Sequence, residues 1–294
     1  ITEVIEDHTH ALECIDHGEF GVCQSCKGEV KVERLELDFT TTICLDCYSE
    51  TQKRMLEKDL ETAAKVQQEL LPSTVPGVSG LRIAAHTEPA GVVSGDYFDF
   101  FDYPDGSLGV VVADVMGKGV AASMLMANLQ AYIRILGPEN PAPCELVNRL
   151  NDMLRFNVKL ISFISLFVVR IAPEEGKIFY CNAGHNPPLL RDAETGSTQW
   201  LKPTGPAVGL TKKTSYKSKE MPFKPGDWLM MYSDGLVEAR NEKDEEFGTD
   251  RLVSFMNDFN RQLPGECLAR LRSDAKSFAG SFQDDFTLVL VKRT

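Results

Sequence analysis

The chain has 294 residues, 43% of them hydrophobic, which is enough for one full core and a smaller module. The formal net charge is −12, and residues 1–71 hold 16 acidic against 7 basic residues, a balance of −9. This acidity argues against binding to nucleic acid or to an anionic membrane, because both need a basic face. No run of about 18 apolar residues is present, so we expect no membrane insertion, and the start at Ile1 suggests a fragment.

Four of the eight cysteines form two Cys-x-x-Cys pairs, Cys23 with Cys26 and Cys44 with Cys47, separated by seventeen residues. Paired knuckles of this kind present four sulfurs to one ion, which predicts a structural zinc site. The alternative is a redox dithiol, which normally uses one such pair near a βαβ pattern. The cysteine pattern favours a reducing cytoplasm over a disulfide scaffold.

The segment around these cysteines, residues 12–30 and Glu33-Arg34-Leu35, resembles the zinc finger of the DksA/TraR proteins. The resemblance implies a zinc-finger domain with four cysteine ligands over residues 1–47. Apolar residues spaced among acids in residues 1–17 are compatible with a helix that Gly18 ends. That family acts on RNA polymerase through a long coiled-coil hairpin. At most a short helix precedes the finger here, so we do not expect that activity. We expect Cys14 to be a packed helix residue, and His17 to be a spare ligand only if a thiolate is lost.

A linker helix is predicted over residues 48–71, which lack Gly and Pro and are followed by Pro72. Apolar positions recur at alternating steps of four and three, with one polar exception, at Leu56, Leu60, Ala63, Gln67 and Leu70. This spacing is typical of a coiled-coil seam and predicts a homodimer through residues 48–71. The alternative is a single amphipathic helix that lies on its own domain. We assign residues 48–76 to this linker.

Strand and helix signals alternate in the remaining chain. We expect strands at 81–88, 108–115, 163–171, 177–181 and 286–291, and helices at 120–136, 145–156, 249–260 and 264–278. For the helix at 120–136 the predicted apolar face is Ala121, Met124, Leu125, Leu129, Ile133 and Leu136. This order predicts an α+β fold, in which helices flank two antiparallel sheets in an αββα layered sandwich.

Four aspartates stand at predicted strand ends: Asp96, Asp114, Asp234 and Asp284. Carboxylates gathered together repel one another, and divalent cations among them relieve that repulsion. A set of oxygen ligands without His or Cys suits Mg²⁺ or Mn²⁺ better than zinc. Taken singly, each aspartate is more often a solvated turn residue.

Five motifs occur in order: Ser94-Gly-Asp-Tyr-Phe-Asp99, Ala113-Asp-Val-Met-Gly-Lys-Gly119, Asn182-Ala-Gly-His-Asn-Pro-Pro-Leu-Leu190, Tyr232-Ser-Asp-Gly-Leu-Val-Glu-Ala-Arg-Asn241 and Asp284-Asp-Phe-Thr-Leu288. Together they resemble the bacterial branch of the metal-dependent (PPM, type 2C) serine/threonine phosphatases, typified by SpoIIE and RsbU. The resemblance runs from about Leu70 to the C-terminus and implies a phosphatase domain over residues 77–294.

The resemblance also implies the site. Two Mn²⁺ or Mg²⁺ ions would activate a water, and Asp114 would bridge the two ions. The Val115 carbonyl would bind one ion. The ions would also be held, singly or through waters, by Asp96, Asp234 and Asp284. Asp285 is the alternative to Asp284, and Asp99 is a candidate for supporting the ligands. His185 could act as a general acid, but its Gly and Pro neighbours favour a turn role.

The implied activity is hydrolysis of phosphoserine or phosphothreonine on a regulatory protein, a STAS-domain anti-sigma factor antagonist. The alternative is an inactive phosphatase-like scaffold that uses the finger for docking. No arginine equivalent to the phosphate-binding residue of eukaryotic members precedes Asp96.

Overall fold

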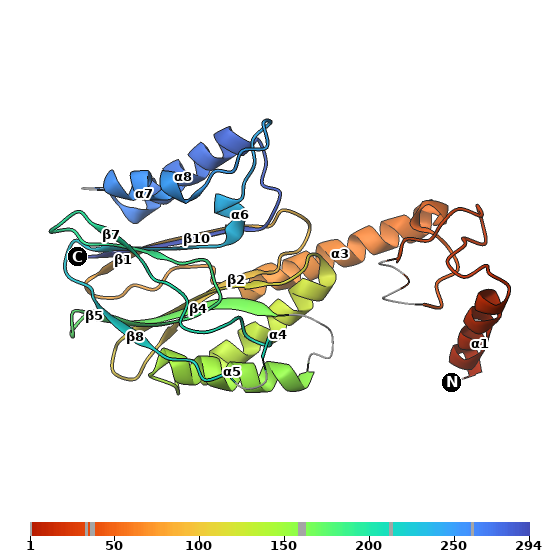
Figure 1. The fold of residues 1–294 in the computed structure, drawn as a ribbon, viewed down its shortest axis with the longest axis horizontal. Coiled ribbons are helices and arrows are strands. Elements are labelled where there is room, and N and C mark those ends of the chain that lie inside the picture. The colour runs from red at the N-terminus through yellow and green to blue at the C-terminus, as the bar shows by residue number, and fades with distance from the viewer. Residues whose placement is uncertain (1, 33–34, 36–38, 158–162, 212–213, 260–261) are drawn as a thin grey trace. The chain divides into compact units, whose positions relative to one another are not determined.

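The computed structural model describes residues 2–32, 35, 39–157, 163–211, 214–259 and 262–294. The chain divides into two compact units, residues 1–62 and 63–294, with the boundary inside the long helix α3 (Glu50–Leu70). Figure 1 shows the elements of each unit. Within the described ranges, no helix combines the length and the apolar character needed to cross a bilayer.

The first unit holds helix α1 (Thr2–Asp16), a loop region with both cysteine pairs, the short 3-10 helix η1 (Leu45–Cys47) and the start of α3. The predicted N-terminal helix is confirmed, apart from Ile1, which lies outside the described residues. Gly18 takes a φ of 71°, a left-handed conformation that suits glycine and lets the chain leave the helix. Glu33 and Arg34, part of the predicted finger motif, also lie outside the described residues.

The described part of the second unit contains two five-stranded sheets in which all paired strands are antiparallel. The first sheet has the order β1 (Leu81–Glu88), β10 (Phe286–Arg293), β9 (Trp228–Tyr232), β6 (Leu189–Arg191), β7 (Thr198–Trp200). The second has the order β2 (Asp96–Asp102), β3 (Leu108–Val115), β4 (Ile164–Ala172), β5 (Lys177–Ala183), β8 (Lys219–Pro222).

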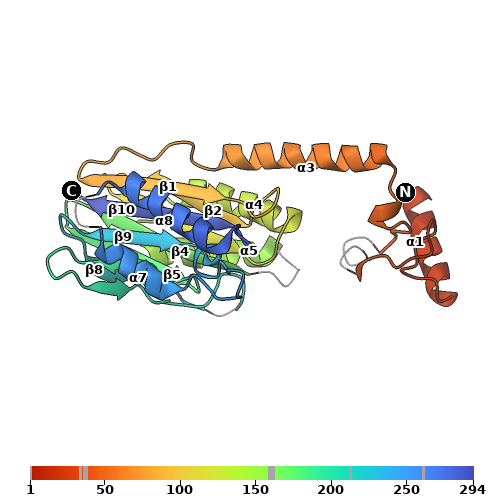
Figure 2. The ribbon, with the colours of Figure 1, turned by 90° about the horizontal axis from the view of Figure 1, so that it is seen from above.

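Helices cover both outer faces of the sheets (Figure 1). Helices α4 (Val120–Leu136) and α5 (Pro143–Asn157) pack on the second sheet, and α8 (Pro264–Ala279) packs on β1 and β10 beside α7 (Thr249–Asn257). Figure 2 shows α7 and α8 lying across the first sheet. The α+β sandwich predicted from the sequence is therefore confirmed.

The core lies in three layers because side chains alternate between the two faces of each strand. Phe98, Val112 and Val289 belong to the layer between the sheets, whereas Tyr97 and Val111 face α4 and α5. Strand β3 is buried at every position except Asp114, which is partly exposed. One acidic residue thus marks the point where this strand meets solvent.

The predicted apolar face of the helix at 120–136 was partly wrong. Met124 is 68% exposed and Ala121 is also exposed. The buried face instead consists of Ala122, Ser123, Met126, Leu129, Ile133 and Leu136. The small residues face inward because the first turn of α4 lies close to the chain at Gly95, where a Cβ would stand 3.4 Å from the Ala122 Cβ.

Candidate active site

Two of the predicted aspartates face each other across neighbouring strands. Asp96 is the first residue of β2 and Asp114 the last but one of β3, and the two are direct partners in the antiparallel pair. Both share the strand parity of Phe98 and Val112, so both carboxylates lie on the face between the sheets. The structure therefore places them together at one end of the sandwich.

Asp234 and Asp284 approach the same place from the other sheet. Asp234 follows β9 and begins the short helix α6 (Asp234–Val237), and Asp284 lies two residues before β10. Their charges act on Asp114, as does the charge of Glu238, a residue that the sequence did not single out. We call Asp96, Asp114, Asp234 and Asp284 the acidic cluster.

Burial and mutual repulsion raise the pKa values of three members of the acidic cluster, Asp96, Asp114 and Asp234. Burial is the largest cause in each case; it and the charge of Asp234 raise the pKa of Asp114 to about 7, and burial with the charge of Glu238 raises that of Asp234 to about 6. The pKa of Asp96 lies well above its ordinary value, through burial and the charge of Asp114. The cluster therefore favours the binding of protons or cations near neutral pH.

Asp96 has one satisfied and one unsatisfied oxygen. Its Oδ2 accepts a hydrogen bond of 2.6 Å from Thr287 Oγ1 on β10, across the two sheets. Its Oδ1 is buried and has no hydrogen-bond partner among the described residues. Buried polar atoms are rarely left unpaired, so this oxygen fits the role of a ligand for a cation.

The Val115 carbonyl oxygen lies against Gly95. A Cβ on residue 95 would stand 2.9 Å from that oxygen, closer than real Cβ atoms come. Gly235 in α6 is confined in the same way, since a Cβ added there would stand 2.2 Å from the Asp285 carbonyl oxygen. These two glycines allow the backbone segments that carry the aspartates to approach closely.

The neighbours Asp284 and Asp285 differ in their surroundings. Both carboxylate oxygens of Asp285 are engaged by backbone groups, at 2.8 Å by the Ala90 N–H and at 2.7 Å by the Gly95 N–H. Asp284 has a half-exposed side chain whose Oδ2 lies 2.8 Å from Lys118 Nζ. The other oxygen of Asp284, Oδ1, accepts from the Asp285 N–H at 2.9 Å. Asp285 therefore holds the segment before β2, whereas the side chain of Asp284 is 43% exposed and accessible.

The hydroxyls of Ser233 and Thr287 form hydrogen bonds at the start of β10. Ser233 Oγ donates to the Asp285 carbonyl at 3.0 Å and accepts from the Thr287 N–H at 2.9 Å. Thr287 in turn donates to Asp96. Neither Ser233 nor Thr287 was identified from the sequence as a site residue, although both lie inside the quoted motifs.

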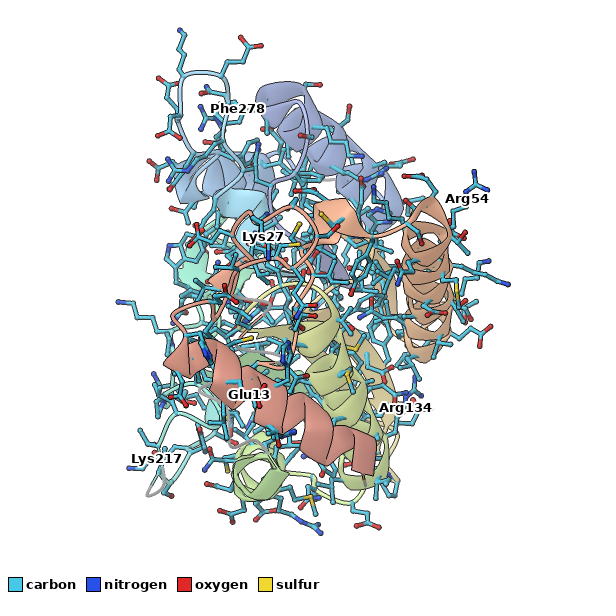
Figure 3. The ribbon with its side chains drawn as sticks, turned by 90° about the vertical axis from the view of Figure 1, so that its right-hand side faces the viewer. Glu13, Lys27, Arg54, Arg134, Lys217 and Phe278 are labelled. Atoms are coloured by element: carbon cyan, nitrogen blue, oxygen red, sulfur yellow. The ribbon has the colours of Figure 1, made fainter. Side chains whose placement is uncertain are left out.

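Asp99 does not lie with the acidic cluster. It is three residues beyond Asp96 and so faces the opposite side of the sheet. There the guanidinium of Arg134 on α4 contacts it at 2.6 and 2.7 Å, and the Tyr97 hydroxyl donates to it at 2.7 Å. Figure 3 labels Arg134 on α4. Asp99 thus joins β2 to α4.

His185 is a buried turn residue. Its Nδ1 lies 2.7 Å from Ser165 Oγ, and its backbone N–H donates to Asn182 Oδ1 at 2.8 Å. Burial lowers the pKa of His185 to about 4, so its ring is neutral at pH 7. These contacts agree with the interpretation that His185 stabilises the turn.

In the first unit, Cys23, Cys26, Cys44 and Cys47 bring their four sulfurs within 4.8 Å of one another. The Cys44 N–H donates to Cys23 Sγ at 3.3 Å, which is the largest cause lowering the pKa of Cys23 to about 6. Of the residues described, no group of three acids in the second unit brings its oxygens as close as these sulfurs. The four sulfurs fit a single tetrahedral ion.

Comparisons with known proteins agree with this geometry. The family model described as "Stage II sporulation protein E (SpoIIE)" matches residues 104–294. Protein IcfG of Synechocystis sp. is 31% identical over 264 residues, which cover 80% of this chain but only 41% of that protein. Phosphoserine phosphatase RsbU of Bacillus subtilis is 27% identical over 248 residues, 81% of this chain and 71% of RsbU.

Solved structures show the same fold. The SiaA-PP2C domain of Pseudomonas aeruginosa matches 84% of this chain and all of its own (100%), with a TM-score of 0.73 and 21% identity. The catalytic domain of the serine/threonine phosphatase PstP, solved in complex with two manganese ions, matches 72% of this chain and 97% of its own, with a TM-score of 0.53 and 14% identity. The second unit has the fold of PP2C-type phosphatase domains, and the chain belongs to the SpoIIE family.

Proposed function

We propose that the second unit is a protein phosphatase that hydrolyses phosphoserine or phosphothreonine on a regulatory protein. The observation that carries this proposal is the acidic cluster, in which aspartates from both sheets converge and Asp96 keeps a buried oxygen without a partner among the described residues. The relatives support the reaction type, since RsbU and RsbP of Bacillus subtilis are both named phosphoserine phosphatases.

The residues at the site fit two Mn²⁺ or Mg²⁺ ions, because every candidate ligand is an oxygen. Asp96, Asp114, Asp234, Asp284 and the Val115 carbonyl would hold them, with Asp114 between the two. When bound, such ions supply a water of lowered pKa and neutralise charge on the phosphate. The contacts of Asp285 favour Asp284 as the ligand of the neighbouring pair.

The remaining residues position these ligands and adjust the charge. Thr287 holds Asp96 through Oδ2, which leaves Oδ1 for a cation. Lys118 places an ammonium group beside Asp284, where it reduces the negative charge that an incoming phosphate would meet. No covalent attachment of the phosphate to the protein is needed.

For the substrate we propose a phosphorylated STAS-domain protein, an anti-sigma factor antagonist. The support is the likeness to RsbU and to the structure of "the RsbU and RsbW domains" of a Mycobacterium tuberculosis protein, which is 27% identical over 75% of this chain. The sequence matches span less than half of IcfG and RsbP, so partners of those whole proteins are not assumed here.

For the first unit we propose a DksA/TraR-like finger with one structural zinc ion held by Cys23, Cys26, Cys44 and Cys47. The homodimer through residues 48–71 also stays a proposal. Exposed Met55, Leu56 and Val66 on α3 provide apolar surface for it.

The test is phosphate release from a phosphoserine peptide by the full chain, with and without added Mn²⁺. We expect release that depends on Mn²⁺ and stops on chelation. If the folded chain binds Mn²⁺ but releases no phosphate from phosphopeptides or from phosphorylated STAS-domain proteins, the inactive scaffold is the better account.

A further inference from the structure

Gln67 is the one buried residue of α3, whose 21 residues all belong to the described part of the chain. Its Nε2 donates to the Ser94 carbonyl at 2.6 Å, and its Oε1 accepts from the Ser94 N–H at 2.9 Å. The side-chain amide therefore binds both backbone groups of a single residue. The donor and the acceptor are matched, as buried amides require.

Ser94 stands directly before the metal-binding segment. Its hydroxyl accepts from the Asp96 N–H at 3.0 Å. Between them, Gly95 donates its N–H to Asp285 Oδ2 at 2.7 Å, and its carbonyl accepts from the Val115 N–H at 3.3 Å. Gln67 thus binds Ser94 directly. Ser94 and Gly95 in turn hydrogen-bond the backbone of Asp96 and Val115, and so set the direction of the Asp96 side chain and the Val115 carbonyl.

The end of α3 is anchored to the second unit at further points. Gln130 on α4 donates from Nε2 to the Leu70 carbonyl at 3.4 Å, and Leu71 packs against two of the core layers. These contacts hold the helix end in place without Gln67. An amide at position 67 is therefore not needed simply to attach the helix.

We propose that Gln67 is a positioning residue for the metal centre. It fixes the backbone of Ser94 so that Asp96 and the Val115 carbonyl converge on one cation. An apolar side chain of the same size would leave the Ser94 N–H and carbonyl buried without partners, and the segment would shift to find others. The inference rests on the proposed function only in that it assumes a divalent cation at the acidic cluster.

The test compares Gln67→Met with Gln68→Met in the full chain. Gln68 is the next residue on the same helix and is exposed, so it controls for the substitution itself. Three quantities are measured: Mn²⁺ affinity by calorimetry, hydrogen exchange of the Ser94 amide, and thermal unfolding without metal.

For Gln67→Met we expect Mn²⁺ affinity to fall at least about tenfold and the Ser94 amide to exchange at least about tenfold faster, a change of about 1.4 kcal/mol in each. Gln68→Met should match the unchanged chain. Phosphatase activity should recover at high Mn²⁺, because the chemistry of the ligands is intact. If Gln67→Met does not fold, Gln67→Asn is compared with Gln68→Met by the same three measurements. Asparagine keeps the amide group, but its shorter side chain holds that group farther from Ser94.

Unchanged Mn²⁺ affinity and unchanged Ser94 exchange in a folded variant would overturn the inference. Failure of the proposed function gives a different pattern: the unsubstituted chain would bind Mn²⁺ and release no phosphate, while the effect of Gln67 on affinity would persist.

Discussion

Asp96 and Asp114 are direct cross-strand partners, and Asp96 accepts a hydrogen bond from the hydroxyl of Thr287 on the other sheet. Two carboxylates opposite each other destabilise a strand pair unless a proton or a cation lies between them. The sandwich tolerates the pair because its two sheets and the helices outside them bury a large apolar core. The repulsion is thus retained where a cation can relieve it.

Asp114→Asn should abolish phosphate release. The substitution keeps the shape of the side chain but removes the charge that faces Asp234 and Asp284. We expect activity on a phosphoserine peptide to fall by about a hundredfold to a thousandfold or more, since removal of one strong electrostatic stabiliser alone costs about that much. Melting temperature without metal should rise or stay constant, because a repulsive charge is lost.

The control for this substitution is Asp102→Asn at the exposed far end of the partner strand β2. It should leave both activity and melting temperature unchanged. Activity retained in a cleanly folded Asp114→Asn protein would count against the bridging role.

Asp284→Asn and Asp285→Asn should separate a ligand from a structural residue. Asp284 is accessible, so its substitution should weaken Mn²⁺ binding with little change in the free energy of unfolding. Asp285 accepts two backbone hydrogen bonds, and an amide can accept only one in the same geometry. Asp285→Asn should therefore lower the free energy of unfolding without metal by about 2 kcal/mol.

Calorimetry for Mn²⁺ and urea unfolding distinguish these two outcomes. The assignment of Asp284 as the ligand fails if Asp285→Asn is the variant that loses Mn²⁺ affinity while keeping its stability.

Much of this arrangement could be predicted from the sequence, because its signals are local. An apolar run followed by Asp and Gly marks a strand end, and paired Cys-x-x-Cys turns mark a thiolate site. The contacts that orient the ligands could not be predicted in this way. Gln67 meets Ser94 27 residues away, and Thr287 meets Asp96 across 191 residues. Such pairs depend on the register between sheets and helices, which no local pattern encodes.

The two interpretations of the helix that contains Gln67 also show that a local pattern does not identify the partner of a buried residue. Its spacing with Leu60 and Leu70 is equally typical of a coiled-coil seam and of a helix packed on its own domain. The structure shows that the last turn of α3 binds its own domain. The buried face of α4 was misjudged for a related reason: small side chains, not large apolar ones, let the helix approach Gly95.

The contribution of Asp114 and Asp234 to the stability of the metal-free chain should fall as pH rises from about 4 to about 7. Asp114 and Asp234 have pKa values raised to about 7 and about 6 in the folded state, so folding favours their protonated forms. Their contribution is fully present below the unfolded-state pKa near 4 and is lost as pH passes the folded-state values. Mn²⁺ competes with these protons, so it should raise the melting temperature more at pH 8 than at pH 5.

Melting temperatures across this pH range, with and without Mn²⁺, check the prediction. Asp114→Asn should flatten the metal-free profile. If Asp114→Asn and the unchanged chain show the same metal-free pH profile between pH 5 and pH 8, the acidic cluster is not buried and crowded in the way described.

Zinc removal should disrupt the first unit and leave the second unit folded. The small core of the first unit consists of Cys23, Val30 and Cys44 with Leu35 and Cys47 packed against it, so without the ion little apolar burial remains. In the proposed site the second unit would hold its ions through oxygen ligands, and it has its own three core layers. Cys23→Ser, or treatment with a zinc-selective chelator, should therefore release one zinc per chain and speed hydrogen exchange in residues 18–32, while phosphate release with excess Mn²⁺ stays within about twofold. Cys267→Ser is the matched control, because Cys267 is a buried residue of α8 in the second unit and should hold no zinc. Loss of phosphatase activity in step with loss of zinc would instead show that the finger controls catalysis, since the two sites share no ligand.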